Sequence, residues 1–131
     1  MNKEIEERFV SKFVVKDKRE RAYFELCSNK KRDNIIHRLF NLLDEKYAIL
    51  NESNIRDEEL DRFIKRYNKK LKECYVIEDG MLDGKTVPYD VAFDKLINTA
   101  GDIFLIYGEN MVIAKEEIYF GNSVKKVLYK E

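Results

Sequence analysis

The densest group of reactive side chains lies in segment 78–86, which reads Glu-Asp-Gly-Met-Leu-Asp-Gly-Lys-Thr. It follows an apolar run at 74–77 that favours a buried strand. The carboxylates of Asp79 and Asp83 suit a hard cation such as Mg²⁺ or Ca²⁺, and the loop also brings the Lys85 ammonium and the Thr86 hydroxyl. The spacing does not match an EF-hand, and acids beside glycines are typical of turns. A small enzyme or a ligand- or metal-binding protein that uses this acidic loop is one hypothesis.

A second candidate site is a group of basic residues near the N-terminus. Segment 11–40 holds nine basic against four acidic residues, whereas segment 74–131 holds six basic against ten acidic residues. A basic cluster with few local acids favours contact with an acidic protein surface or with nucleic acid. The predicted partner-binding residues are Lys16, Arg19, Arg21, Lys30, Lys31 and Arg32, and Lys18 lies among them.

A further basic ridge lies on the helix expected after Asp57. Its members share the side opposite the apolar residues, and Glu58–Arg62 and Asp61–Lys65 are spaced i,i+4 for ion pairing. Acids at the start of a helix and bases at its end are also what the helix dipole favours. We therefore expect a solvated, self-paired face. The ridge consists of Arg62, Lys65, Arg66 and Lys69.

His37 is the single histidine of the chain. It is thus the side chain that titrates near neutral pH without a perturbed environment, and a Cys–His or Ser–His catalytic pair would have to use it. It falls at the margin of an apolar helix face, one turn after Asp33, and we expect Asp33 to hydrogen-bond it as a boundary residue. The sequence holds no P-loop, GxGxxG, GxSxG or HExxH motif, and we predict no cofactor and no metal.

Apolar residues recur at helical spacing in five segments. The first follows a candidate N-cap at Asn2, the second opens on a predicted capping box at Asp17, the third follows Ser28, and the fifth begins near Pro88 and stops at Gly101. The fourth has the clearest periodicity, and its expected core positions are Leu60, Phe63, Ile64, Tyr67 and Leu71. Segment 44–57 lacks periodicity and predicts a loop.

Short apolar runs at 74–77 and 103–107 flank the fifth helix, and a strand–helix–strand order predicts a parallel pair. Turn signals at 108–110 and 121–123 then predict an antiparallel meander of 103–107, 111–119 and 124–130. The sequence therefore predicts an α+β fold with N-terminal helices packed on a mixed sheet of about four strands. Four aromatic residues are expected in the core or in cross-strand pairs: Tyr107, Tyr119, Phe120 and Tyr129.

Length and composition set the remaining expectations. A chain of 131 residues that is 44% apolar is long enough for one domain over 1–131 with its own core. The first residues are too acidic for a signal peptide, and no apolar run approaches bilayer length, so we expect a cytoplasmic protein without membrane contact. Cys27 and Cys74 lack metal-site spacing and are expected to be core residues. Abundant Lys, Asn, Ile and Tyr are typical of bacterial proteins from AT-rich genomes.

Three functions follow from these patterns. The favoured one is a non-enzymatic bacterial protein-interaction module that neutralises or regulates a charged protein partner, in the manner of an immunity protein or a regulator. The second is nucleic-acid binding through the basic helices, although the net charge of zero argues against general DNA binding. The third is an enzyme that uses the acidic loop.

Overall fold

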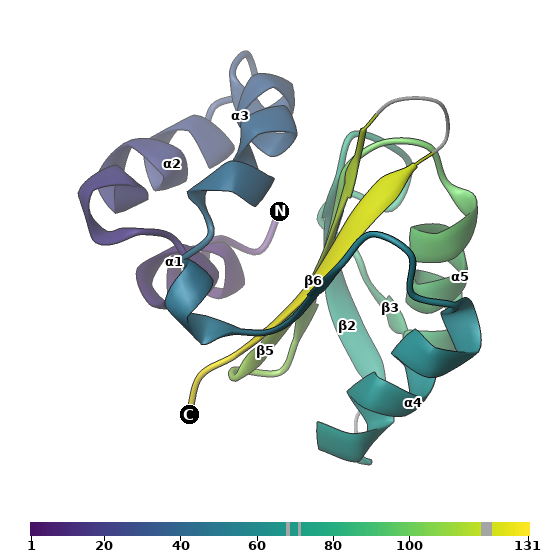
Figure 1. Cartoon of the computed structure of the whole chain (residues 1–131). Coiled ribbons are helices and arrows are strands. Elements are labelled where there is room, and N and C mark those ends of the chain that lie inside the picture. Colours follow the sequence, from purple (N-terminus) through teal and green to yellow (C-terminus); the bar gives the residue numbers. More distant parts are fainter. Residues whose placement is uncertain (68, 71, 119–121) are drawn as a thin grey trace.

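The computed structural model describes residues 1–67, 69–70, 72–118 and 122–131, and it confirms the predicted α+β class. A single six-stranded sheet lies between two layers of helices (Figure 1). One layer contains α1 (Lys3–Phe13), α2 (Arg19–Leu26) and α3 (Arg32–Leu39), and the other contains α4 (Asp57–Tyr67) and α5 (Tyr89–Asn98). The strands are β1 (Ala48–Glu52), β2 (Glu73–Glu78), β3 (Thr86–Pro88), β4 (Ile103–Tyr107), β5 (Met111–Glu117) and β6 (Ser123–Tyr129).

The strand order is β1-β6-β5-β4-β2-β3, and every neighbouring pair is antiparallel. The predicted meander of β4, β5 and β6 is confirmed. Gly108, which has a φ of 60°, lies in the turn between β4 and β5, where a left-handed conformation favours glycine. The predictions for Tyr119, Phe120 and Gly121 lie outside the described residues.

The sheet is antiparallel rather than mixed, which corrects the predicted parallel pair. β2 pairs with β4 in the antiparallel sense, with Val76 opposite Leu105. The acidic loop reverses the chain after β2 and leads into β3, which the sequence analysis missed. Gly84, at a φ of 76°, donates its N–H to the Val76 carbonyl in this reversal. The α5 crossover therefore joins β3 to β4, two strands that run in the same direction on either side of β2.

The expected loop at 44–57 contains β1, which brings the sheet to six strands instead of about four. β1 pairs with β6, and the register shifts between Ala48 and Leu50 as at a β-bulge. A five-residue strand whose last two residues are exposed does not show a clear apolar period of two. Its partner is about 75 positions away in the sequence, so the pairing was not visible in the local pattern.

The two faces of the sheet carry separate apolar cores. Because neighbouring strand residues point to opposite faces, Tyr75 and Ile77 pack against the α1–α3 layer, whereas Cys74 and Val76 pack against α4 and α5. Phe9, Phe13, Ile36 and Leu39 fill the first core, and Leu60, Ile64, Ala92 and Leu96 fill the second. In the fourth helix Phe63 is half-buried and Tyr67 is 45% exposed, so the predicted core position of Tyr67 is wrong, and Leu71 lies outside the described residues.

The helix ends match some of the sequence signals. The side chain of Asn2 accepts a hydrogen bond from the backbone N–H of Ile5 and caps α1 as predicted. Asp17 instead lies in a short 3₁₀ turn (Lys16–Lys18), and α2 begins at Arg19 without a side-chain cap, so the predicted capping box does not form. Two other 3₁₀ turns, Phe40–Leu42 and Glu45–Tyr47, link α3 to β1.

Candidate functional site

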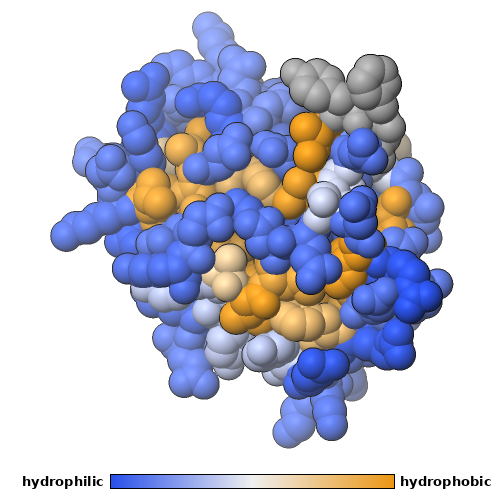
Figure 2. All heavy atoms as spheres, in the orientation of Figure 1, coloured by the Kyte–Doolittle hydropathy of each residue, from blue (hydrophilic) through white to orange (hydrophobic). Residues whose placement is uncertain are grey.

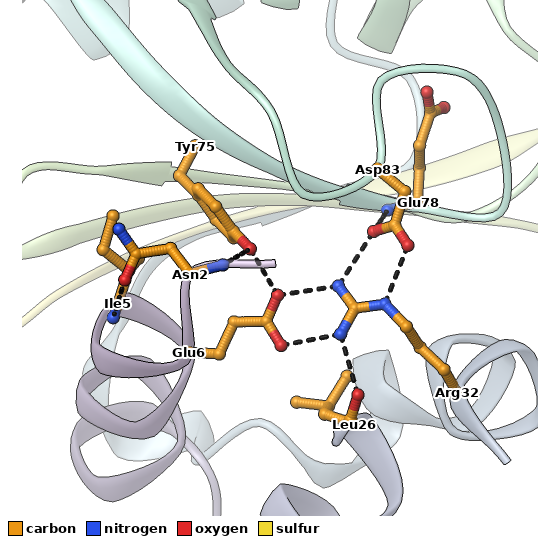
Figure 3. A network of polar contacts seen from close by, with 8 residues as sticks. All are labelled: Asn2, Ile5, Glu6, Leu26, Arg32, Tyr75, Glu78 and Asp83. Atoms are coloured by element: carbon orange, nitrogen blue, oxygen red, sulfur yellow. Dashed lines mark hydrogen bonds and ion pairs between the residues drawn. The ribbon is translucent and has the colours of Figure 1, made fainter. Parts of the chain in front are cut away.

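The most buried group of charges centres on Arg32, at the start of α3 (Figure 3). Arg32 donates two hydrogen bonds to the carboxylate of Glu6 at 2.6 and 2.7 Å, and two to Asp83 at 2.7 and 2.9 Å. Its exposed fraction is 6%, and that of Glu6 is 2%. The network therefore joins α1, α3 and the acidic loop inside the protein, and Arg32 does not lie on the exposed basic surface that the sequence predicts.

Tyr75 of β2 completes this network. Its hydroxyl donates to Glu6 at 2.5 Å and accepts the backbone N–H of Asn2 at 3.0 Å. Burial, together with the hydrogen bond to Glu6, raises the pKa of Tyr75 well above its usual value. Burial alone would lower the pKa of Arg32, but its hydrogen bonds to Glu6 and Asp83 outweigh burial and raise that pKa. Both side chains thus keep their protons, which suits a structural role rather than proton transfer.

The acidic loop does not gather the three predicted ligand-binding residues. Asp83 faces Arg32 and also accepts the backbone N–H of Glu78, whereas Asp79 is exposed and lies 3.1 Å from the ring of His37. Lys85 is exposed as well. In the part of the chain that the structure describes, no three His, Cys, Asp or Glu side chains are placed to hold a metal ion.

His37 lies between two aspartates, neither of which is the expected Asp33. Its Nε2 is 3.1 Å from Asp79, and its Nδ1 is 3.9 Å from Asp102, the residue just before β4. Burial raises the pKa of Asp102, and the N–H of Glu117 and the neighbouring His37 offset part of that effect. Sequence proximity pointed to Asp33, but the fold brings two distant loops against α3 instead. His37 links those loops and, within the described residues, contacts no Ser or Cys nucleophile.

The cysteines do not supply a nucleophile next to His37 either. Cys74 is buried in β2, and burial raises its pKa to about 12, so its reactive thiolate form is scarce near neutral pH. Cys27 is exposed at the end of α2, which corrects its predicted core position.

Two of the predicted strand aromatics lie among the described residues. Tyr107 is buried in the core as predicted, and its ring lies 5.3 Å from that of Tyr89. Tyr129 is half-buried against the same core, and its ring lies 5.7 Å from that of Tyr67 in α4 at a tilted angle.

The remaining predicted partner-binding residues surround α2. Lys16, Arg21, Lys30 and Lys31 are exposed, while Arg19 is half-buried and donates to the carbonyl of Val14 at 2.8 Å. Because α2 spans eight residues, or about 12 Å, Lys16 and Lys30 lie at opposite ends of it. The predicted residues therefore flank a helix on both sides instead of forming one compact patch.

The side of α2 between these ends carries an exposed aromatic ring that the sequence analysis missed. Phe24 is 63% exposed, and the ammonium of Lys31 lies 5.5 Å from its ring centroid. Arg21 and Phe24 are three residues apart on α2 and share one side of it, and Lys18, the residue just before α2, is three residues from Arg21. The sequence could have indicated this exposed ring, because Phe24 is an aromatic residue outside the apolar face of a short helix. We call Lys18, Arg21, Phe24, Lys31 and Arg38 the α2 surface.

A buried carboxylate organises the arginines of the α2 surface. Glu25 accepts from Arg21 at 2.9 Å and from Arg38 of α3 at 2.5 Å. Hydrogen bonding from Arg21, with a further contribution from Arg38, lowers the pKa of Glu25 despite its burial. Beside it lies a cavity of about 190 Å³ with an apolar floor and a basic rim. Lys18, Arg21, Ala22, Glu25, Ile35, Arg38 and Leu42 line this cavity.

The basic ridge of α4 is only partly self-paired. Lys65 pairs with Asp61 at 3.0 Å, as predicted. Arg62 does not pair with the Glu58 carboxylate and instead donates weakly, at 3.4 Å, to the Glu58 backbone carbonyl. The guanidinium of Arg66 lies 5.9 Å from the Phe63 ring. Within the described residues, neither arginine forms an ion pair.

No protein-family model matches this chain, and the searches of curated proteins and of solved structures found no similar protein. Among the described residues, no helix is long and apolar enough to cross a membrane, and α1 and α4 contain 11 residues each. The function is therefore inferred from the side chains of this chain alone.

Proposed function

We propose that this chain is a non-enzymatic protein-interaction module that binds an acidic partner protein through the α2 surface. The observation that carries this proposal is Phe24, a large apolar ring that is 63% exposed beside the ammonium of Lys31. Aromatic side chains and arginines are the residues that most often dominate binding energy at protein interfaces. A ring bordered by cations therefore suits a partner with apolar and acidic side chains.

The charges around Phe24 support an acidic partner. Lys18 and Lys31 form no ion pair within the described residues, and both are exposed. Arg21 and Arg38 share one carboxylate, Glu25, so the cavity beside α2 has an excess of positive charge. Such an excess speeds the approach of an acidic protein and disfavours a basic one.

The acidic loop supports an enzymatic function less well. Asp83 is held by the buried Arg32, and the Glu78 carboxylate accepts the backbone N–H of Leu82 at 2.9 Å. These carboxylates already serve to fix the loop against the sheet and α3. Their role in holding the fold favours an interaction module over catalysis at this loop.

The test is a capture experiment with a charge-matched control. The triple variant Lys18→Glu, Phe24→Ser, Lys31→Glu alters only exposed side chains, and Lys72→Glu with Lys85→Glu reverses two exposed lysines elsewhere. We expect wild type and control to retain an acidic protein from a bacterial lysate in a salt-sensitive manner. The triple variant should bind that purified protein at least about tenfold more weakly.

Two results would contradict this proposal. Equal affinity of the triple variant would remove the α2 surface as the docking site. Loss of the captured material after nuclease treatment, with a steep dependence of affinity on salt, would favour nucleic acid as the partner. Far-UV circular dichroism of the triple variant confirms that any loss of binding does not arise from unfolding.

A further inference from the structure

The β1 edge of the sheet is open to a further strand. β1 is the terminal strand and, among the described residues, pairs with β6 alone, so its other side offers unpaired backbone N–H and C=O groups. The opposite edge differs, because β3 has three residues and ends at Pro88, and both features discourage strand addition. β1 has five residues and no proline.

A groove of about 390 Å³ runs between β1 and α4. The β-bulge at the start of β1 turns two consecutive side chains, Ile49 and Leu50, toward α4, and Ile55 and Phe63 extend the apolar floor. Figure 2, in which the β1 side of the molecule faces the viewer, shows hydrophobic side chains exposed between hydrophilic ones. An edge strand with an apolar groove beside it can bind both the backbone and the side chains of a peptide.

The rim of this groove has an excess of positive charge. Arg62 and Arg66 line it, and neither forms an ion pair within the described part of the chain. Glu59 also lines it, but Arg56 neutralises this carboxylate at 2.5 Å. With Arg56 counted, three guanidinium groups border the groove against the two carboxylates of Glu52 and Glu59.

We propose that β1 and this groove bind an extended segment of a partner protein that adds to the sheet as a seventh strand. Strand addition would satisfy the open backbone groups, and alternate side chains of the added segment would point into the groove. The apolar floor selects apolar side chains at these positions, and the arginines select acidic residues beside them.

A second copy of this chain fits the edge less well. Antiparallel pairing of two β1 strands about a two-fold axis keeps the same sheet face on the same side. The α4 helices of both copies would then flank the seam, with Arg62 and Arg66 of one copy facing those of the other. Like charges at such a seam disfavour the dimer, whereas an acidic segment is attracted.

This inference is independent of the proposed function. α2 covers one face of the sheet and α4 covers the other, so variants at the two sites do not share contacts. A negative binding result at one site therefore does not contradict the proposal for the other site, and each site is tested with its own variants.

The probe is an acetylated and amidated pentapeptide of alternating valine and glutamate. It is titrated into the ¹⁵N-labelled full chain while the backbone amide shifts are recorded. We expect saturable shifts at residues 49–52 and 59–66. The variant Arg62→Gln, Arg66→Gln should weaken binding about two- to tenfold, because two charge contacts are removed. The control Lys72→Gln, Lys85→Gln loses the same net charge near the opposite edge of the sheet and should bind as wild type does.

Two altered peptides test the mode of binding. Replacing glutamate with lysine should abolish the shifts, because the arginines then repel the peptide. N-methylation of alternate residues removes the hydrogen bonds of one peptide edge and should also abolish them, since strand addition needs those bonds. Equal binding of either altered peptide would overturn the proposal, as would a dimer of the free chain whose β1 amides are protected from exchange. The Lys18→Glu, Phe24→Ser, Lys31→Glu variant should bind the pentapeptide normally.

Discussion

Both faces of the sheet pack against their helices through apolar cores, and the α1–α3 face adds a buried ionic network. On the α1–α3 side, a buried guanidinium bridges two carboxylates, Glu6 and Asp83, from different parts of the chain. On the α4–α5 side, Leu60, Ile64 and Leu96 pack as fully buried aliphatic side chains. There, the polar contact of Tyr89 with Asp61 lies at the edge of the layer.

This difference indicates which face of the sheet requires one exact arrangement of side chains and which face tolerates substitution. Apolar surfaces can repack with modest loss, because dispersion and burial are not directional. A buried ion pair is stable only in one geometry, since each charge loses its hydration on folding. The α1–α3 layer should therefore depend on a few charged residues as well as on its apolar core, whereas the α4–α5 layer should depend mainly on apolar volume.

The largest effect is expected for Arg32→Met. This substitution roughly keeps the side-chain length but leaves the buried Glu6 and the half-buried Asp83 without their cation, which typically costs about 3–5 kcal/mol of the free energy of unfolding. Urea denaturation followed by circular dichroism measures the loss. Adding Glu6→Gln and Asp83→Asn should recover part of it, because the uncompensated charges are then removed. A loss below about 1 kcal/mol for the single variant would show that the network is not a determinant of the α1–α3 layer.

Leu60→Ala tests the other face. Leu60 is fully buried between α4 and the sheet, and its truncation should lower the free energy of unfolding by about 3 kcal/mol through lost burial and a residual cavity. Leu60→Met changes shape at similar volume and should cost less than about 1.5 kcal/mol. If Leu60→Met lowered the free energy of unfolding as much as Leu60→Ala, the α4–α5 face would require one exact packing geometry, as the ionic network does.

Tyr89→Phe removes one polar contact from the apolar face. The Tyr89 hydroxyl donates to Asp61 at 2.5 Å, while its ring lies 5.5 and 5.3 Å from the tilted rings of Phe93 and Tyr107. Since the ring contacts persist in phenylalanine and only a hydrogen bond to a carboxylate is lost, we expect a loss of about 2 kcal/mol, measured by chemical denaturation. A loss as large as that of Arg32→Met would contradict the contrast between the two faces.

Acid should weaken the α1–α3 side through Glu25. The pKa of Glu25 is lowered by its hydrogen bond from Arg21 and by Arg38, so the unfolded chain binds a proton at a higher pH than the folded chain. This contribution to stability is present above the unfolded value of about 4.5 and is lost as the pH falls through the folded pKa. Glu25→Gln should therefore show a shallower stability loss below pH 4.5 than wild type, whereas Glu20→Gln, an exposed change on the same helix, should not.

The sequence by itself determined the elements that have a strong local period. Ile5, Phe9, Val10 and Phe13 predicted α1, and the runs at 74–77 and 103–107 predicted β2 and β4. Glycine-containing turn signals predicted the antiparallel meander of the last three strands. In each case the signal lies within one turn or one strand, because side-chain direction follows the backbone period.

Tertiary structure alone decided which charges are buried. The sequence placed Arg32 with exposed bases and Asp83 with a ligand-binding loop, yet they are partners separated by 51 positions. Likewise, β1 finds β6 only in the folded chain, and β3 reverses the direction of the segment that leads into α5. Residue type reveals what a side chain can bind, but burial and long-range pairing depend on which surfaces meet when the helical layers close over the sheet.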